Sequence, residues 1–218
     1  MSVQGDVNAS DGRTVRFYDT GAVPDAGPTV FWHHGTPQTG RLLDPIVEAA
    51  ARRGMRVVSC ARAGYEGTSE IPGRTVAAAA ADVIRVADEL GIARFATMGA
   101  SGGGPHALAA AALAPDRIVG VVTLAGIAPF TTDFDWFAGM ASPGGLSSGL
   151  EGRAARAAYA EIAEFDETSF TEADFRMLAG PWSVLGADAQ RASGAGAAGR
   201  STTMSPSRSR GDSSSATF

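Results

Sequence analysis

The 218-residue sequence predicts an α/β fold built on a mostly parallel β-sheet. Three observations predict it. Short apolar runs alternate with longer segments of helical periodicity over residues 14–126. A glycine-rich turn joins one of these runs to the helix that follows it, and residues 131–190 then contain helical stretches without a further strand-like run. Strand–helix–strand alternation of this kind implies parallel strands with right-handed crossovers.

Five segments have the composition of strands. Residues 14–19 alternate apolar and polar side chains, as an edge or antiparallel strand does. Residues 28–34 and 56–60 are compact apolar runs suited to buried parallel strands. Residues 94–99 and 118–126 have the same character, so we expect them to be buried parallel strands as well.

Three helices are expected between these strands. Residues 42–53 place their apolar side chains on one helical face. Residues 76–90 follow three-and-four spacing, with Gly91 suited to cap the carboxyl end. The third helix covers residues 103–114 and is closed by Pro115.

The chain divides into three parts by composition. Residues 1–130 form the α/β core, residues 131–190 a helical cap over the sheet, and residues 191–218 a disordered tail without Leu, Ile, Val, Tyr or Trp. The abrupt change to Ser, Arg, Gly, Ala and Thr indicates a frameshift near residues 188–198 that replaced the last strands of the sheet. A natural linker tail is the alternative.

Charge and composition exclude several classes of partner. All 18 basic residues are arginine, and the net charge of the chain is −5. The tail adds four arginines and one aspartate, or +3, so residues 1–190 carry −8. A body this acidic repels nucleic acid. No apolar run reaches the roughly 20 residues of a membrane span, and the N-terminus lacks the blocks of a signal peptide. We therefore expect a cytoplasmic protein that binds neither nucleic acid nor membranes.

The glycine-rich turn has three interpretations. A dinucleotide-binding fingerprint fails, because Ser101 stands at the second glycine position counted from Gly99 and Ala107 at the third counted from Gly102. A phosphate-binding P-loop needs a lysine, which the sequence lacks. Residues 99–103 instead match G-x-S-x-G between a strand and a helix, where a sharp turn exposes the serine and favours glycine on both sides, at Gly99 and Gly103. A glycine-rich cap on a buried helix is the alternative.

Ser101 is the candidate catalytic nucleophile, and attack on an acyl carbon would require donors for the oxyanion that develops. The backbone N–H of Gly102 is one candidate donor. Thr36, in the loop after a buried strand, is the second, because the next residue, Pro37, has no N–H. An ordinary turn is the alternative for that loop. Candidates for lining a substrate pocket are His34, Phe130 and Trp136, although aromatic side chains in a helical insertion more often serve packing.

Three stretches in this order resemble the α/β-hydrolase family: HHGTP (33–37), ARAGYEGTS (61–69) and GASGGGPHALA (99–109). Ala61 and Ala63 stand where the family motif of the middle stretch has aspartate and proline. The resemblance covers residues 12–190. It implies an eight-stranded sheet, a helical cap after the sixth strand, a Ser–acid–His triad, and no cofactor or metal. A serine nucleophile also argues against the dehalogenase and epoxide-hydrolase branches, which use aspartate.

The acid and the base of such a triad are missing. The family order is serine, acid, histidine, but among His33, His34 and His106 only the last follows Ser101, on a helix expected to direct it away from the serine. No strand-like run follows residue 126, so we expect a sheet that is truncated at its C-terminal end.

The sequence therefore predicts a serine acyl hydrolase for a small ester, lactone or amide substrate, inactive or weakly active without its base. The alternative is a non-catalytic pseudo-hydrolase that binds a small acyl ligand or a protein partner. Nothing in the sequence predicts the oligomeric state.

Overall fold

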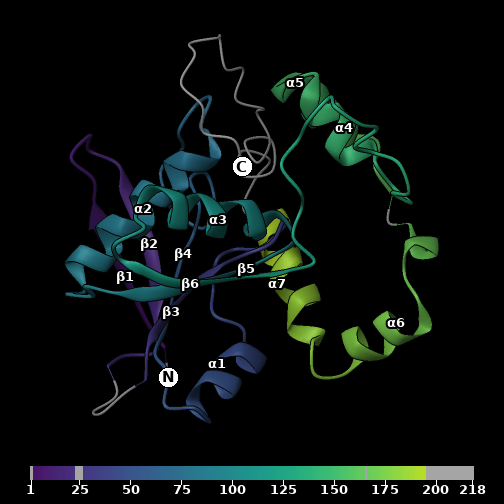
Figure 1. The fold of residues 1–218 in the computed structure, drawn as a ribbon. Coiled ribbons are helices and arrows are strands. Elements are labelled where there is room, and N and C mark those ends of the chain that lie inside the picture. Colours follow the sequence, from purple (N-terminus) through teal and green to yellow (C-terminus); the bar gives the residue numbers. More distant parts are fainter. Residues whose placement is uncertain (1, 23–26, 165, 195–218) are drawn as a thin grey trace.

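The computed structural model describes residues 2–22, 27–164 and 166–194. Its centre is a six-stranded sheet in the order β1-β2-β4-β3-β5-β6 (Figure 1). The strands are β1 (Val3–Asn8), β2 (Thr14–Asp19), β3 (Thr29–His33), β4 (Val57–Cys60), β5 (Phe95–Ala100) and β6 (Ile118–Leu124). β4, β3, β5 and β6 run parallel, whereas β2 pairs antiparallel with both β1 and β4. The predicted mostly parallel α/β sheet is confirmed.

The five predicted strands are all present, and β1 is an additional strand that the periodicity did not indicate. Its sequence, VQGDVN, has a glycine and an aspartate among few apolar residues. It becomes a strand because it pairs along its whole length with β2, from Val3 opposite Asp19 to Asn8 opposite Thr14. Val7 is the one β1 side chain that reaches the core. Tertiary pairing therefore overrides a weak local preference here.

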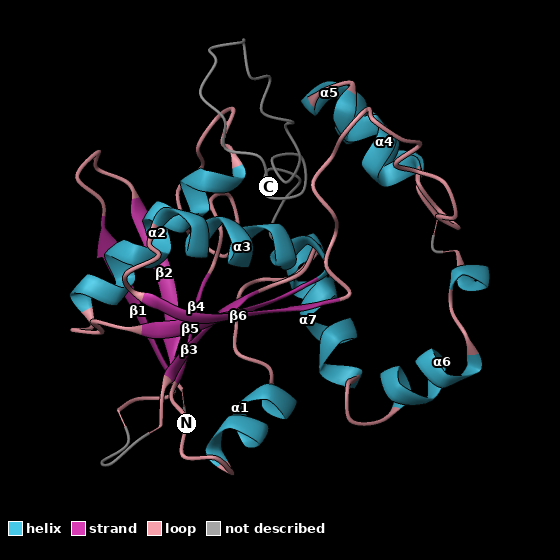
Figure 2. Cartoon of the chain, in the orientation of Figure 1, coloured by secondary structure: helices cyan, strands magenta, loops and turns pink. Residues whose placement is uncertain are grey.

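Helices cover both faces of the sheet, as Figure 2 shows. On one face α2 (Val76–Glu89) packs its apolar side chains on the sheet, and α3 (Gly104–Leu113) lies beside it. The core on this side contains Val7, Val15, Phe17, Phe31, Val58, Cys60, Val83, Val86, Ala87, Ile92 and Phe95. On the other face α1 (Asp44–Ala51) packs through Ile46 against Trp32 and Val57, joined by residues at the start of α7 (Ser183–Gly194). The result is a three-layer α/β architecture.

The segment after β6 is helical, as expected. It forms α4 (Gly144–Leu150), α5 (Arg153–Ile162), α6 (Glu172–Ala179) and α7. Figure 1 shows α4, α5 and α6 as an open arc beside the sheet, beyond the end of β6, and the chain returns to the sheet through α7. α7 continues to Gly194, past the expected start of the tail at residue 191. Residues 195–218, which hold the rest of the predicted tail, lie outside the described residues.

β6 differs from its prediction in burial. Its sequence, IVGVVTL, predicts a buried strand, yet six of its seven residues are exposed. β6 is the last strand of the sheet in the order observed, so one of its edges has no neighbouring strand among the described residues. Its apolar composition therefore produces an exposed apolar edge.

Candidate active site

Ser101 lies at a sharp turn between β5 and α3. Its φ of +50° is in the left-handed region that a residue with a side chain seldom adopts. A short 3₁₀ turn, Ser101–Gly103, follows β5 directly and leads into α3. The Ser101 side chain is exposed to solvent, and its backbone carbonyl accepts a hydrogen bond from the N–H of Ile127 (3.3 Å). This geometry matches the serine-presenting turn that G-x-S-x-G describes.

The glycines of this turn are required by close backbone contacts. A Cβ on Gly99 would collide with the carbonyl oxygen of Gly103. A Cβ on Gly103 would collide with the carbonyl oxygen of His33 at the end of β3. Both obstacles are backbone atoms, which a rotamer change cannot move aside. The turn therefore has its sharpness because two positions lack side chains.

The loop after β3 lies directly beside the serine turn. A Cβ placed on Gly102 would lie 3.1 Å from Thr36 Oγ1 and 4.0 Å from the backbone nitrogen of Thr36. Within the described part of the chain, the Thr36 N–H donates no hydrogen bond to another protein group. The structure thus brings Ser101, Gly102 and Thr36 together from two neighbouring strands, β5 and β3, with one backbone donor unused.

Arg62 holds this loop from the buried side. Its guanidinium donates Nη1–H to the carbonyl oxygen of His34, and Nη2–H to the carbonyl oxygen of Gly35 (3.1 Å) and to Thr36 Oγ1 (3.0 Å). The Arg62 residue is 4 % exposed, and burial lowers its pKa to about 10. Arg62 lies in the stretch ARAGYEGTS (61–69), but its role was not predicted from the sequence. Its position directly after a buried strand is the signal that could have indicated it.

All three histidines of the sequence are buried. His33, His34 and His106 are 4 %, 1 % and 2 % exposed. Desolvation lowers the pKa of His33 to about 3 and holds the pKa values of His34 and His106 well below the usual value. His106 Nδ1–H donates to the carbonyl oxygen of Val76 at the start of α2 (3.3 Å), so its ring packs against that helix.

His34 holds the loop through both of its ring nitrogens. Its Nδ1–H donates to the carbonyl oxygen of Gly35 (2.9 Å), and its Nε2 accepts the backbone N–H of Arg62 (3.1 Å). Both ring nitrogens are thereby used by the backbone, which fixes the neutral ring in one tautomer. Within the described residues, no hydrogen bond reaches Ser101 Oγ, so the structure places no base on the candidate nucleophile.

The other two pocket candidates belong to an aromatic cluster that follows β6. The rings of Phe130, Trp136 and Phe137 meet at centroid distances between 5.0 and 6.3 Å. Trp136 is buried and donates its indole N–H to the carbonyl oxygen of Pro129 (3.1 Å), whereas Phe130 is partly exposed. The cluster begins three residues after Ile127, which contacts the Ser101 backbone. The role of Phe130 and Trp136 as lining of a substrate pocket stays a prediction.

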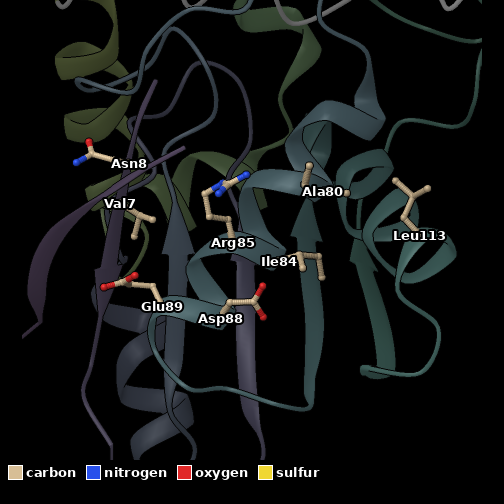
Figure 3. A pocket seen from close by; sticks show the side chains of 9 residues that line it. Val7, Asn8, Ala80, Ile84, Arg85, Asp88, Glu89 and Leu113 are labelled. Atoms are coloured by element: carbon tan, nitrogen blue, oxygen red, sulfur yellow. The ribbon is translucent and has the colours of Figure 1, made fainter. Parts of the chain in front are cut away.

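A surface depression lies away from this site. It has a volume of about 600 Å³ and lies over α2, with Val7 and Asn8 of β1 on one side and Leu113 of α3 on the other (Figure 3). Arg85, Asp88 and Glu89 of α2 line it as well. None of the candidate site residues lines this depression.

Asp188 is a second long-range contact that sequence analysis missed. From helix α7 it accepts the backbone N–H of Thr39 (2.9 Å) and the Thr39 hydroxyl (2.6 Å), and it is buried. Thr39 follows Thr36 in the same loop. The contact ties the last described helix to the loop beside the serine, across 149 residues of sequence. No local sequence pattern indicates a contact between residues this far apart in the chain.

Comparisons with known proteins agree with this architecture. A family model described as the alpha/beta hydrolase fold matches residues 28–158. A hydrolase from Pseudomonas aeruginosa PA01 superposes with a TM-score of 0.66 at 20 % identity, over 92 % of this chain and 70 % of that one. A thermophilic esterase from Thermogutta terrifontis gives a TM-score of 0.61 at 21 % identity, over 93 % and 70 %.

A thioesterase domain from the curacin biosynthetic pathway gives a TM-score of 0.52 at 22 % identity, and this chain spans about half (49 %) of that domain. No curated protein matches the sequence. In the described ranges, every helix is too short or too polar to cross a membrane. The family match covers more than half of the sequence and agrees with the sheet order and the serine turn, so the chain belongs to the alpha/beta hydrolase fold family.

Proposed function

We propose that this chain is a serine acyl hydrolase scaffold for small ester, lactone or amide substrates, with Ser101 as its nucleophile. The observation that carries the proposal is the strained, solvent-exposed Ser101 beside the unused N–H of Thr36. In this chemistry Ser101 Oγ adds to the acyl carbon, the carbonyl electron pair moves onto oxygen, and the Oγ proton leaves. The N–H groups of Thr36 and Gly102 would donate to the resulting oxyanion. The chemistry calls for no cofactor and no metal.

The leaving proton limits the rate. Without an imidazole within reach, it must pass to water, and the hydroxyl remains a weak nucleophile at neutral pH. The three buried histidines cannot accept it. Loss of a triad leaves only about 10³- to 10⁴-fold acceleration, which comes from binding and the oxyanion donors. We therefore propose that turnover by this chain is very slow, in a cytoplasmic setting and without nucleic-acid or membrane partners.

A fluorophosphonate probe tests the nucleophile directly. Ser101 Oγ would form a bond to phosphorus as fluoride leaves, and the proton would pass to solvent. Peptide mass spectrometry should find the adduct on Ser101, and Ser101→Ala should abolish it. Ser142→Ala is the matched control, because Ser142 is also exposed but lies in the segment after β6. Labelling elsewhere, or labelling that survives Ser101→Ala, would refute the proposal.

The burial of all three histidines also favours a second candidate, a non-catalytic pseudo-hydrolase that binds a small acyl ligand or a protein partner. The two candidates differ in their dependence on the hydroxyl. A hydrolase should release 4-nitrophenol from 4-nitrophenyl acetate in proportion to intact Ser101. A binder should retain ligand affinity in Ser101→Ala and release no 4-nitrophenol above the buffer rate.

A further inference from the structure

We infer that Arg62 is a positioning residue that fixes the Gly35–Thr36 peptide and so aims the Thr36 N–H at the oxyanion, an inference that rests on the proposed role of Thr36. Two donors meet on the Gly35 carbonyl oxygen: Arg62 Nη2 at 3.1 Å and His34 Nδ1 at 2.9 Å. The same Arg62 nitrogen also donates to Thr36 Oγ1 at 3.0 Å. One guanidinium nitrogen therefore holds the carbonyl oxygen of this peptide unit and the side chain of the residue that follows it.

Because the peptide bond is planar, this contact fixes the direction in which the Thr36 N–H points. In a trans peptide the carbonyl oxygen and the N–H of the next residue point to opposite sides. The Gly35 oxygen points toward the buried Arg62, so the Thr36 N–H points away from Arg62. The Thr36 nitrogen lies 4.0 Å from the position that a Cβ of Gly102 would occupy, so this side borders the serine turn. Rotation of this one peptide would remove the donor from the site.

Gln38 and His34 limit that rotation from the neighbouring atoms. The N–H of Gly35 donates to Gln38 Oε1 (2.5 Å), and His34 Nε2 accepts from the backbone N–H of Arg62 (3.1 Å). The backbone N–H of Arg62 thus orients the His34 imidazole. The Nδ1–H of that imidazole and the Arg62 side chain both donate to the Gly35 carbonyl oxygen. The charge of Arg62 contributes as well, because a cationic donor on a carbonyl polarises the N–H of the same peptide.

The burial of Arg62 requires an explanation that packing alone does not supply. Within the described residues, no carboxylate lies within 4.0 Å of its guanidinium, in contrast to Arg13, Arg16, Arg41 and Arg56. Moving an unpaired cation out of water is costly. Here the charge is compensated by the Tyr65 side chain, whose ring centroid lies 5.3 Å from the guanidinium carbon, and by oxygen atoms of the loop that carries the proposed donor. The contacts to the loop are the arrangement that a positioning role requires.

The chain supplies a matched control. Arg41 also joins this loop to the loop that contains Arg62, through Nε and Nη2 to Glu66 Oε1 at 2.9 and 2.5 Å. That ion pair is more exposed and does not reach the Gly35–Thr36 peptide. If arginines merely tie the two loops together, Arg41→Lys and Arg62→Lys should have similar effects on the serine. If Arg62 aims the donor, their effects on the serine should differ.

The test measures the kinetics of fluorophosphonate labelling at Ser101 in the full chain, with the maximal rate of bond formation separated from the probe affinity. Arg62→Lys should lower the maximal rate at least tenfold and leave the affinity within twofold, because the donor acts on the developing charge. Arg41→Lys should leave both constants within twofold of the wild type. Equal losses in the two variants, or a loss confined to affinity, would overturn the inference.

NMR separates failure of this inference from failure of the proposed function. Arg62→Lys should move the Gly35 carbonyl ¹³C and Thr36 amide ¹⁵N resonances, and Arg41→Lys should leave both in place. If the wild type is not labelled at all, the proposed function falls, and these shifts decide the positioning role alone. If Arg62→Lys fails to fold, the wild type should still show a scalar coupling from Arg62 Nη to the Gly35 carbonyl across the hydrogen bond. Unmoved shifts in the folded variant, or an absent coupling in that case, would overturn the inference.

Discussion

β5 and β6 lie side by side in one sheet, but the strand with the more apolar sequence, β6 (IVGVVTL, against FATMGA in β5), is the more exposed of the two. In β5 the side chains of Phe95 and Thr97 are fully buried, and β3 and β6 flank the strand on its two edges. In β6, Val119 and Val122 are 51 % and 50 % exposed. The difference shows that the apolar character of a strand does not determine its burial, which depends on what packs against it.

The candidate site belongs to the β5 side of this comparison. Ser101 follows β5, the Thr36 loop follows the neighbouring β3, and Arg62 follows β4 on the next position of the sheet. These are the strands whose faces are covered by α1 and α2. A site that depends on aimed backbone donors requires such rigid support. The β6 side contributes the partly exposed aromatic cluster and the exposed edge.

Two glycine substitutions, one in the turn after β5 and one within β6, should show the largest difference between these two regions. Gly103→Ala drives a Cβ into the His33 carbonyl, so we expect a loss of more than about 3 kcal/mol of unfolding free energy and no labelling of Ser101. Gly120→Ala on β6 meets no atom within 4 Å and should stabilise the protein by about 0.5 kcal/mol. Urea unfolding of both variants measures this. A Gly103→Ala protein as stable as Gly120→Ala would mean that the serine turn is not closely packed.

A fall in pH should destabilise the folded protein, and β3 with the loop after it should open first. Burial lowers the pKa of all three histidines in the folded state, so the unfolded chain binds more protons below about pH 6.5. Their contribution to stability is complete above that pH. It is lost as the pH falls toward the folded pKa, about 3 for His33. The expected loss is about 1 kcal/mol per pH unit for each histidine.

Urea unfolding between about pH 7 and pH 5 measures this slope, and His106→Asn should reduce it by about one third, since one of three titrating groups is removed. Hydrogen exchange at the lower pH should increase first in β3 and the loop after it, which hold His33 and His34. A stability that does not change over this range would show that the histidines are accessible to protonation in the folded protein.

Much of the fold and the centre of the candidate site were predictable from local sequence. The strand at residues 14–19 was predicted to the residue, because its alternation reflects one buried face. The serine turn was predicted from the G-x-S-x-G spacing and from its place between a strand and a helix, and the structure shows why Gly99 and Gly103 must be glycine. These features have causes within a few residues of each other.

Contacts between distant segments were not predictable in the same way. β1 forms because β2 offers it an edge, and β6 is exposed because of where the sheet order ends among the described strands. Arg62 acts on residues 26 to 28 positions away, and Asp188 on Thr39 at 149. Periodicity reports the face of a segment, but it does not report which other segment that face will meet.

Substitutions on the exposed edge of β6 should change the unfolding free energy least, but they should change aggregation strongly. Val119, Val121, Val122 and Leu124 are exposed along this strand. Unpaired apolar edges promote strand pairing between molecules, so we expect the wild type to bind ANS and to aggregate. The double variant Val119→Lys/Val122→Lys should reduce ANS fluorescence and light scattering, because charges on an edge oppose pairing. The two lysines remain in water, so the unfolding free energy should change by less than about 0.5 kcal/mol.

Val58→Lys on β4 is the matched control, because Val58 is fully buried in the part of the sheet that helices cover. A lysine there would leave an unpaired charge in the core, and we expect that variant not to fold. If the double variant on β6 were also to unfold, β6 would be covered in solution, and the contrast with β5 would disappear. If it kept its stability but aggregated as before, the surface that drives association would lie elsewhere, and the exposed Leu108 and Leu113 of α3 would be the next to replace.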